Sequence, residues 1–296
     1  MRRLLLPVFS TLLIWQHDTH AAAEAACDSP AAIRFSLVPA GDSNKRFKSY
    51  QPLLRRIEAL AGRPVKVVWP TSYAAVVEGL LAGSIDVAEL GPAAYVAARH
   101  GDPRITPFAT LSMRPGLFQV AGPNYHSLLA VRADSAYGDI GALKGSRLAL
   151  ADPGSTSGSL VPRALFGPLL GTTFENHFGT VSYSGTHRRS LLALAAGEVD
   201  AAFVAANQLD EAVAAGILAA DQVRILWKSE PIPRDPSVYR GQLCEPLSQA
   251  IRSAFFGPGA EAELRSVLDD LQAERFVAVD DSHYAVLRRV ISNRKP

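Results

Sequence analysis

Residues 80–88 read LLAGSIDVA, and residues 194–202 read LAAGEVDAA. In each stretch an apolar helical segment ends at a glycine, and a strand begins two residues later with an aspartate at its second position. The two copies lie 114 residues apart, as Gly83 and Gly197 show. This repeat favours two lobes built on the same plan. The alternative, that any turn from helix through glycine to strand reads this way, stays open.

Strands and helices alternate along the chain around the first copy. We expect strands at residues 33–38, 65–69 and 85–90. Residues 50–61 carry apolar side chains at helical spacing, and Ser72 is placed to cap a second helix that ends at Gly83. Such alternation predicts an α/β fold with mixed, mostly parallel sheets.

The repeat divides the chain into two lobes and a tail. We expect lobe 1 to comprise residues 31–117 together with 227–296, and lobe 2 to comprise residues 118–226. The tail adds helices near 245–255 and 261–273, with no strands of their own, so we expect it to pack on lobe 1. A chain that crosses twice between two lobes forms a cleft, which is where such proteins bind ligands.

Composition narrows the class of protein and its location. The chain has 296 residues, of which 48% are hydrophobic and 20% charged, so it can bury a sizeable core. The net charge of +2, without a Lys/Arg cluster, argues against nucleic acid as a partner. Residues 1–23 have a basic start, a short apolar run and Ala21-Ala22-Ala23, which together predict a signal peptide and export.

The chain contains two cysteines, Cys27 and Cys244. In an oxidising compartment they can form a disulfide between the mature N-terminus and the C-terminal part. Alternatively, Cys27 is an acylated lipoprotein cysteine, although residues 24–26 (EAA) lack the usual apolar residue three positions upstream. The absence of a CxxC motif or a His/Cys cluster leads us to expect no metal and no cofactor.

Residues 152–158, DPGSTSG, lie between an apolar run and a helix that we expect over 159–170. Glycines allow close backbone approach, and hydroxyls and helix N-terminal N–H groups attract an anion without a formal positive charge. A plain helix cap explains the same residues. A third interpretation is a hydrolase that uses Thr156 and His187, but Thr is unusual as the central residue of a nucleophile elbow.

Six ordered motifs make the mature chain resemble the periplasmic phosphonate/phosphite-binding proteins of ABC importers, which have the two-lobed type II periplasmic binding protein fold. The motifs are 72–77 (SYAAVV), 90–95 (LGPAAY), 124–127 (NYHS), 152–158 with 160–163 (LVPR), 184–187 (SGTH), and 227–229 (WKS) with 232–236 (IPRDP).

The resemblance implies a set of ligand-binding residues and no catalytic residue. Ser155, Thr156 and Ser157 would donate hydroxyl and backbone N–H groups to a phosphonate, Tyr73 and His187 would close on it from opposite lobes, and Tyr125 would line the pocket at the lobe crossing. For each tyrosine a plain core position, and for His187 a surface loop position, stay open as alternatives.

The ligand's tail is where the sequence departs from the family pattern. Relatives that bind aminoalkylphosphonates place two carboxylates around the ammonium group; Asp235 matches one of them, but Asn207 stands at the other position. We therefore expect a ligand with a small or uncharged tail, such as phosphite, methylphosphonate or phosphate. Glu89 either faces the cleft or points to solvent.

The resemblance implies a monomeric periplasmic receptor that captures a small phosphorus oxyanion and presents it to an inner-membrane ABC permease, with no enzymatic activity. A sensory receptor of the same fold that signals to a membrane kinase stays open, and so does binding of another small anion such as a sulfonate.

Overall fold

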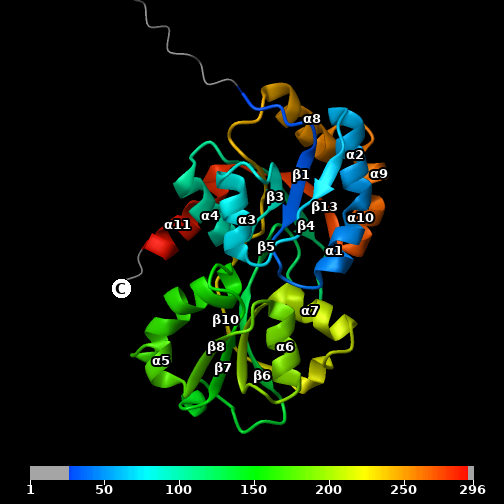
Figure 1. Cartoon of the computed structure of the whole chain (residues 1–296). Helices are drawn as coiled ribbons and strands as arrows, with labels where there is room; N and C mark the ends of the chain where they lie inside the picture. Colours follow the sequence, from blue (N-terminus) through cyan, green and yellow to red (C-terminus); the bar gives the residue numbers. More distant parts are fainter. Residues whose placement is uncertain (1–26, 293–296) are drawn as a thin grey trace, which may run out of the picture.

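The computed structural model describes residues 27–292; the predicted signal peptide, residues 1–23, lies outside them. A six-stranded sheet in the order β13-β4-β12-β3-β1-β2 forms the centre of the upper lobe in Figure 1. Its strands are β1 (Ile33–Leu37), β2 (Val65–Val67), β3 (Val87–Glu89), β4 (Thr106–Met113), β12 (Ser237–Tyr239) and β13 (Ala273–Ala278). The helices of this lobe are α1 (Ser43–Ser49), α2 (Gln51–Ala61), α3 (Tyr73–Leu81), α4 (Pro92–Gly101), α8 (Glu245–Phe256), α9 (Ala260–Glu263), α10 (Arg265–Asp270) and α11 (Ala285–Ser292).

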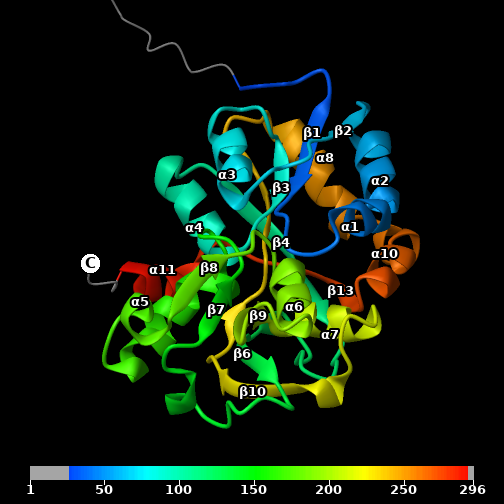
Figure 2. The same cartoon turned by 60° about the horizontal axis from the view of Figure 1, so that its bottom comes forward.

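A five-stranded sheet in the order β10-β6-β9-β7-β8 forms the lower lobe (Figures 1 and 2). Its strands are β6 (Ser127–Arg132), β7 (Arg147–Leu150), β8 (Thr180–Tyr183), β9 (Ala201–Ala205) and β10 (Val223–Lys228). Its α-helices are α5 (Phe174–His177), α6 (His187–Ala195) and α7 (Ala206–Ala214). Shorter helical turns are η1 (Gly141–Leu143), η2 (Thr156–Leu160), η3 (Pro162–Phe166), η4 (Gly167–Leu170), η5 (Ala220–Gln222) and, in the tail, η6 (Asp281–Tyr284).

The two chain crossings between the lobes run side by side. β5 (Asn124–Tyr125) pairs antiparallel with β11 (Ile232–Pro233) as a separate two-stranded sheet, and β5 lies at the junction of the lobes in Figure 1. The lower sheet continues through β10 to Lys228, two residues beyond the position at which we expected lobe 2 to end. Two short paired crossings are the kind of connection at which hinge motion is absorbed in two-lobed proteins.

The repeat at residues 80–88 and 194–202 has the same structure in both lobes. Each copy ends a helix at a glycine with positive φ, 70° and 72°, and enters a strand of a parallel trio, β2-β1-β3 or β8-β7-β9. The aspartates have the same role: Asp86 accepts the backbone N–H of Arg34, and Asp200 that of Arg147, both at 2.8 Å. The prediction of two lobes on one plan is therefore confirmed.

The tail differs from our expectation in one respect. It packs on lobe 1 as expected, because Leu247 and Ile251 of α8 share a core cluster with Leu53 and Ile57 of α2. However, the expectation that it has no strands was wrong: β12 lies between β3 and β4, and β13, which begins at the last residue of the predicted helix 261–273, forms the sheet edge. Of the nine strand pairs of the two sheets within residues 27–292, five are antiparallel and four parallel, and three of the five antiparallel pairs involve these tail strands.

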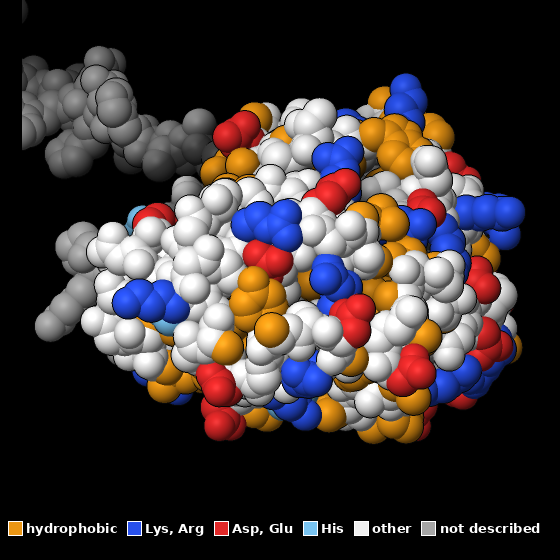
Figure 3. All heavy atoms as spheres, turned by 90° about the horizontal axis from the view of Figure 1, so that it is seen from below, with side chains coloured by type: hydrophobic (Ala, Val, Ile, Leu, Met, Phe, Trp, Pro, Cys, Tyr) orange, Lys and Arg blue, Asp and Glu red, His pale blue; other side chains and the backbone are white. Residues whose placement is uncertain are grey.

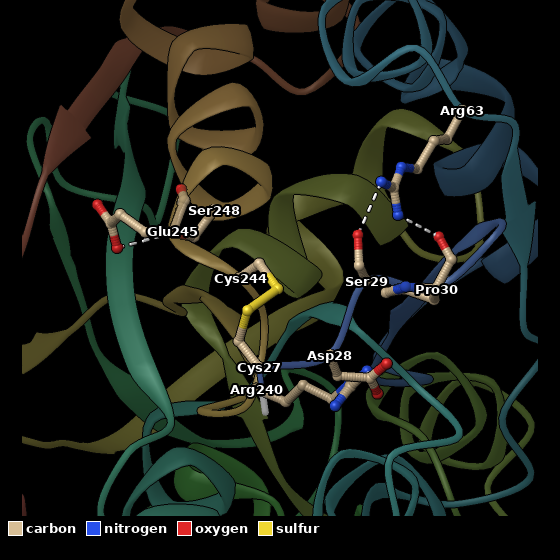
Figure 4. The surroundings of a disulfide bond; sticks show 9 residues. All are labelled: Cys27, Asp28, Ser29, Pro30, Arg63, Arg240, Cys244, Glu245 and Ser248. Carbon is tan, nitrogen blue, oxygen red and sulfur yellow. Dashed lines mark hydrogen bonds and ion pairs between the residues drawn. A yellow bond between two sulfur atoms is a disulfide. The ribbon is translucent and has the colours of Figure 1, made fainter. Parts of the chain in front are cut away.

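A disulfide joins Cys27 to Cys244, with an S–S distance of 1.99 Å and a Cα–Cα distance of 4.8 Å (Figure 4). Next to it, Arg240 forms ion pairs with Asp28 and with the buried Asp86, the latter at 2.7 Å. The predicted pairing is confirmed in the structure, and a Cys27 thiol in this bond is not available for acylation. The bond attaches the start of the described chain to Cys244, the N-cap residue of α8.

The surface of the lower lobe carries mixed charge. On the face seen in Figure 3, Lys and Arg side chains are interspersed with Asp and Glu. Over residues 27–292, each helix is too short or too polar to cross a membrane.

Candidate functional site

A small cavity lies between the lobes, and all eight residues that we predicted to bind a ligand line it. Its volume is about 40 Å³. A water molecule needs roughly 10–15 Å³ on this scale, so the space suits a group the size of a tetrahedral oxyanion better than a larger molecule. The predicted residues in its wall are Tyr73, Tyr125, Ser155, Thr156, Ser157, His187, Asn207 and Asp235.

The DPGSTSG turn carries the chain from β7 onto η2 and exposes its hydroxyls to the cavity. The helix begins at Thr156, three residues earlier than we predicted, and Ser155 caps it by accepting the Gly158 N–H at 3.1 Å. The chain is wound as two wide turns, η2 and η3, and Pro162 is the first residue of η3, where its missing N–H is tolerated. Ser155 therefore caps the helix and lines the cavity at the same time.

His187 orients the Ser155 hydroxyl. Its Nδ1 accepts the backbone N–H of Ala205 at 3.3 Å, which places the ring proton on Nε2, 3.2 Å from Ser155 Oγ. Burial lowers the pKa of His187 to about 4, so the ring is neutral at pH 7. A Cβ at Gly158 would lie 2.8 Å from the His187 ring, which explains the glycine there. Ser155 Oγ thus accepts two hydrogen bonds, and its own hydrogen is free to point into the cavity.

Thr156 connects the two lobes. Its Oγ1 accepts the N–H of Ala93, in the first turn of α4, at 2.9 Å. The N-cap residue of α4, Gly91, offers no capping side chain, so a hydroxyl from the opposite lobe satisfies one of the free N–H groups of that helix. Because Thr156 Oγ1 accepts this bond, its hydrogen is available as a donor to a ligand.

This geometry argues against the hydrolase interpretation. The Nε2–H of His187 is directed at Ser155 rather than Thr156, and its Nδ1 contacts an amide N–H where a catalytic triad would place a carboxylate. A neutral ring that carries its proton on Nε2 is not a general base for either hydroxyl.

The two predicted tyrosines bring neutral phenol groups to the cavity. Tyr73, at the start of α3, is 3% exposed, and Tyr125, in crossing strand β5, is 4% exposed. Burial raises the pKa of both phenols, so both remain protonated hydrogen-bond donors. Both side chains are buried, and each also lines the cavity. Each tyrosine is therefore a core residue and a pocket residue at the same time.

The structure adds charged and polar residues, two arginines among them, that the sequence did not point to. Arg46, Tyr50, Gln208, Glu211 and Arg234 also line the cavity. We had expected an anion site without a formal positive charge, and this expectation was incomplete because two arginines line the cavity. Arg234 lies within the IPRDP motif, next to Asp235, and this motif was the available signal for it.

Glu89 faces the cavity, which decides the question that the sequence left open. Its carboxylate pairs with Arg46 at 2.5 Å and accepts the Tyr50 hydroxyl. Arg46 also donates to the Val38 carbonyl at 2.9 Å. The charge of Glu89 is thus compensated inside the wall of the cavity.

The remaining carboxyl groups are shifted towards their neutral forms. Burial, reinforced by the charge of Glu89, raises the pKa of Asp235 to about 7. Burial also raises the pKa of Glu211, which accepts from Gln208 at 2.9 Å and lies one turn beyond Asn207 on α7. The arrangement combines several neutral hydroxyl donors with nearly balanced charges, which is suited to holding a small oxyanion without covalent chemistry.

The sequence matches proteins that are described as binding phosphonate or importing phosphate. Residues 35–284 match the family model described as the periplasmic phosphonate substrate-binding protein of an ABC transporter. The chain is 34% identical over 212 residues to the phosphate-import protein PhnD of Mycolicibacterium smegmatis, covering 69% of this chain and 64% of that protein's length.

Two further similarities extend over most of the chain. It is 26% identical over 264 residues to the phosphonates-binding periplasmic protein of Escherichia coli, covering 88% of this chain and 75% of that protein. The crystal structure of a binding protein component of an ABC phosphonate transporter from Pseudomonas aeruginosa superposes with a TM-score of 0.80 at 27% identity, covering 88% and 86% of the two chains.

Proposed function

The chain belongs to the family of periplasmic phosphonate substrate-binding proteins of ABC transporters, and on that premise we propose that it captures a small phosphorus oxyanion between its lobes for an inner-membrane ABC permease. The observation that carries the proposal is the group of five hydroxyls around one small cavity, contributed by Tyr73, Tyr125, Ser155, Thr156 and Ser157.

Phosphite, methylphosphonate and phosphate are the ligands that this cavity fits best. Each presents oxygen atoms in a tetrahedral arrangement, which neutral donors on several sides can satisfy together. The volume of about 40 Å³ leaves little room beyond the head group. Asn207 supplies no charge where relatives that bind a cationic tail carry an acid, and Glu211, one turn further, is already engaged by Gln208.

Calorimetric titration of the mature protein with phosphite, methylphosphonate, phosphate, aminoethylphosphonate and sulfate tests this proposal. We expect at least one of the first three to bind at micromolar concentration or below, and aminoethylphosphonate to bind more weakly. Thr156→Val should abolish or strongly weaken binding, whereas Thr172→Val, an identical change on an exposed loop of the same lobe, should not. Failure of all phosphorus oxyanions to bind would refute the proposal.

Transport and sensing require a separate experiment. We propose import because both the family description and the relative from Mycolicibacterium smegmatis refer to transport. Deleting the gene should then reduce cellular uptake of the labelled anion and leave the response of membrane kinases intact. Normal uptake together with a lost kinase response would support the sensory receptor instead.

A further inference from the structure

Arg46 lies at the boundary between two compartments of the cleft. The inner cavity contains the hydroxyl donors, and a larger groove of about 570 Å³ lies outside it. Residues 155–157 line the inner cavity and not the groove. The two compartments share four lining residues, which are Arg46, Asn207, Glu211 and Leu271.

The groove beyond this boundary would accept an organic substituent. Its wall includes apolar side chains from both lobes: Met113 of β4 and Leu117, which follows that strand, come from lobe 1, and Val213 of α7 comes from lobe 2. Leu117 is 70% exposed, so the groove is open to solvent. In size and composition this space is suited to an alkyl chain, whereas the inner cavity is not.

Arg46 is held firmly at the boundary. It donates to Glu89 and to the Val38 carbonyl, both in lobe 1, and Tyr50 holds the other oxygen of Glu89. Its side chain is only 14% exposed. Burial alone would lower the pKa of Arg46, but the nearby acidic groups, Glu89 above all, raise it by more. The guanidinium therefore remains charged. A long side chain with fixed partners blocks space more effectively than a mobile one.

We propose that Arg46 is a specificity-determining residue that closes the inner cavity against substituted phosphonates. In this arrangement, the guanidinium separates the oxyanion site from the groove, so a ligand larger than methylphosphonate meets a fixed cation where its chain would pass. The inference rests on the proposed function, because it assumes that the head group sits among the hydroxyls.

The test compares two ligands that share a head group, methylphosphonate and n-butylphosphonate, by calorimetry. For the wild-type protein we expect methylphosphonate to bind at least tenfold more tightly. Arg46→Ala should reduce that preference at least tenfold, because the butyl chain can then enter the groove. Lys45→Ala, which removes a cation of the same helix that lines only the groove, should leave the preference unchanged.

A second variant controls for the unpaired carboxylate that Arg46→Ala leaves in the cavity wall. Arg46→Ala combined with Glu89→Gln removes both charges while Tyr50 can still donate to the amide oxygen, and it should show the same loss of preference. Thermal unfolding verifies that each variant is folded.

The possible results separate the inference from the proposed function. Equal weakening for both ligands in both variants would mean that Arg46 contacts the head group, and an unchanged preference would mean that it does not close the cavity; either result overturns the inference. If the wild-type protein binds no phosphorus oxyanion, the proposed function itself fails.

Discussion

Thr156→Val replaces a hydroxyl by a methyl group of nearly the same shape, at a residue that is 2% exposed. The change removes two interactions in the proposed complex. One is the hydrogen bond that the Thr156 hydroxyl donates to the oxyanion, and the other is the 2.9 Å bond from the Ala93 N–H of the opposite lobe. In an open form water can satisfy that N–H, so its loss is felt when the lobes close.

The expected size of the effect follows from these two losses. A hydrogen bond to a charged group contributes about 1.5–3 kcal/mol, and a buried donor left without a partner costs about 1–3 kcal/mol. Their sum, about 2.5–6 kcal/mol, corresponds to an affinity at least about 60-fold weaker, since each 1.4 kcal/mol is tenfold. Thr156→Ser keeps both bonds and loses one methyl group, worth about 0.8 kcal/mol, so it should weaken binding only about fourfold.

Calorimetry with phosphite or methylphosphonate measures this difference, and small-angle scattering reports whether the unliganded variant shifts to a more open form. We expect the valine variant to bind at least tenfold more weakly than the serine variant and to be more open. Equal affinities for the two variants would show that neither hydrogen bond contributes to binding, which would refute the role that we assign to Thr156.

Three other predictions concern stability and protonation. Replacing Cys27 and Cys244 by serine should cost about 2–5 kcal/mol of unfolding free energy, and thermal denaturation should show a lower Tm than that of the oxidised wild type. Because the pKa of Asp235 is raised to about 7, the folded protein holds a proton that the unfolded chain releases near pH 4, so wild-type stability should fall as pH rises from 4 to 7 and then level off. Asp235→Asn should lack this fall, and thermal unfolding at pH 5 and pH 8 compares the two; parallel pH profiles would contradict the raised pKa. The His187 ring should remain neutral at pH 6 with its proton on Nε2, as nitrogen NMR shifts can show, and a charged ring at that pH would contradict its burial without a counter-charge.

The sequence predicted the hydroxyl side of the site better than its charged side. Residues 155–157 are adjacent in the chain and their turn has a recognisable form, and Tyr73 and His187 each lie at a helix start marked by a capping residue, Ser72 and Thr186. Arg46 and Glu89 are 43 residues apart; the sequence did not single out Arg46, and it left open whether Glu89 faces the cleft. Their pairing depends on how α1 packs against the end of β3, which no local pattern specifies.

The same distinction applies to the fold. The repeated turn identified two lobes because its glycine and aspartate have fixed structural roles in both copies. By contrast, β12 is three residues long, too short for alternation between polar and apolar residues to be visible. Its place between β3 and β4 is a tertiary property, and it made the sheet more antiparallel than the sequence indicated.

The selectivity of the proposed site would come from its neutral donors more than from its arginines. Because Arg46 is paired with Glu89, its charge adds little attraction for a ligand. Apart from Tyr50, whose hydroxyl donates to Glu89, five hydroxyl groups line the cavity. At about 1.5–3 kcal/mol each, bonds from these hydroxyls to an anion amount to about 7–15 kcal/mol before the costs of binding. Micromolar and nanomolar complexes require about 8 and 12 kcal/mol, so the neutral donors alone approach this range, and attraction from Arg234, which also lines the cavity, adds to it. Such donors discriminate by the number and direction of oxygen atoms, whereas a cation would attract any anion of the same charge. A cavity of this kind should therefore distinguish phosphite, which has three oxygen atoms, from sulfate, which has four.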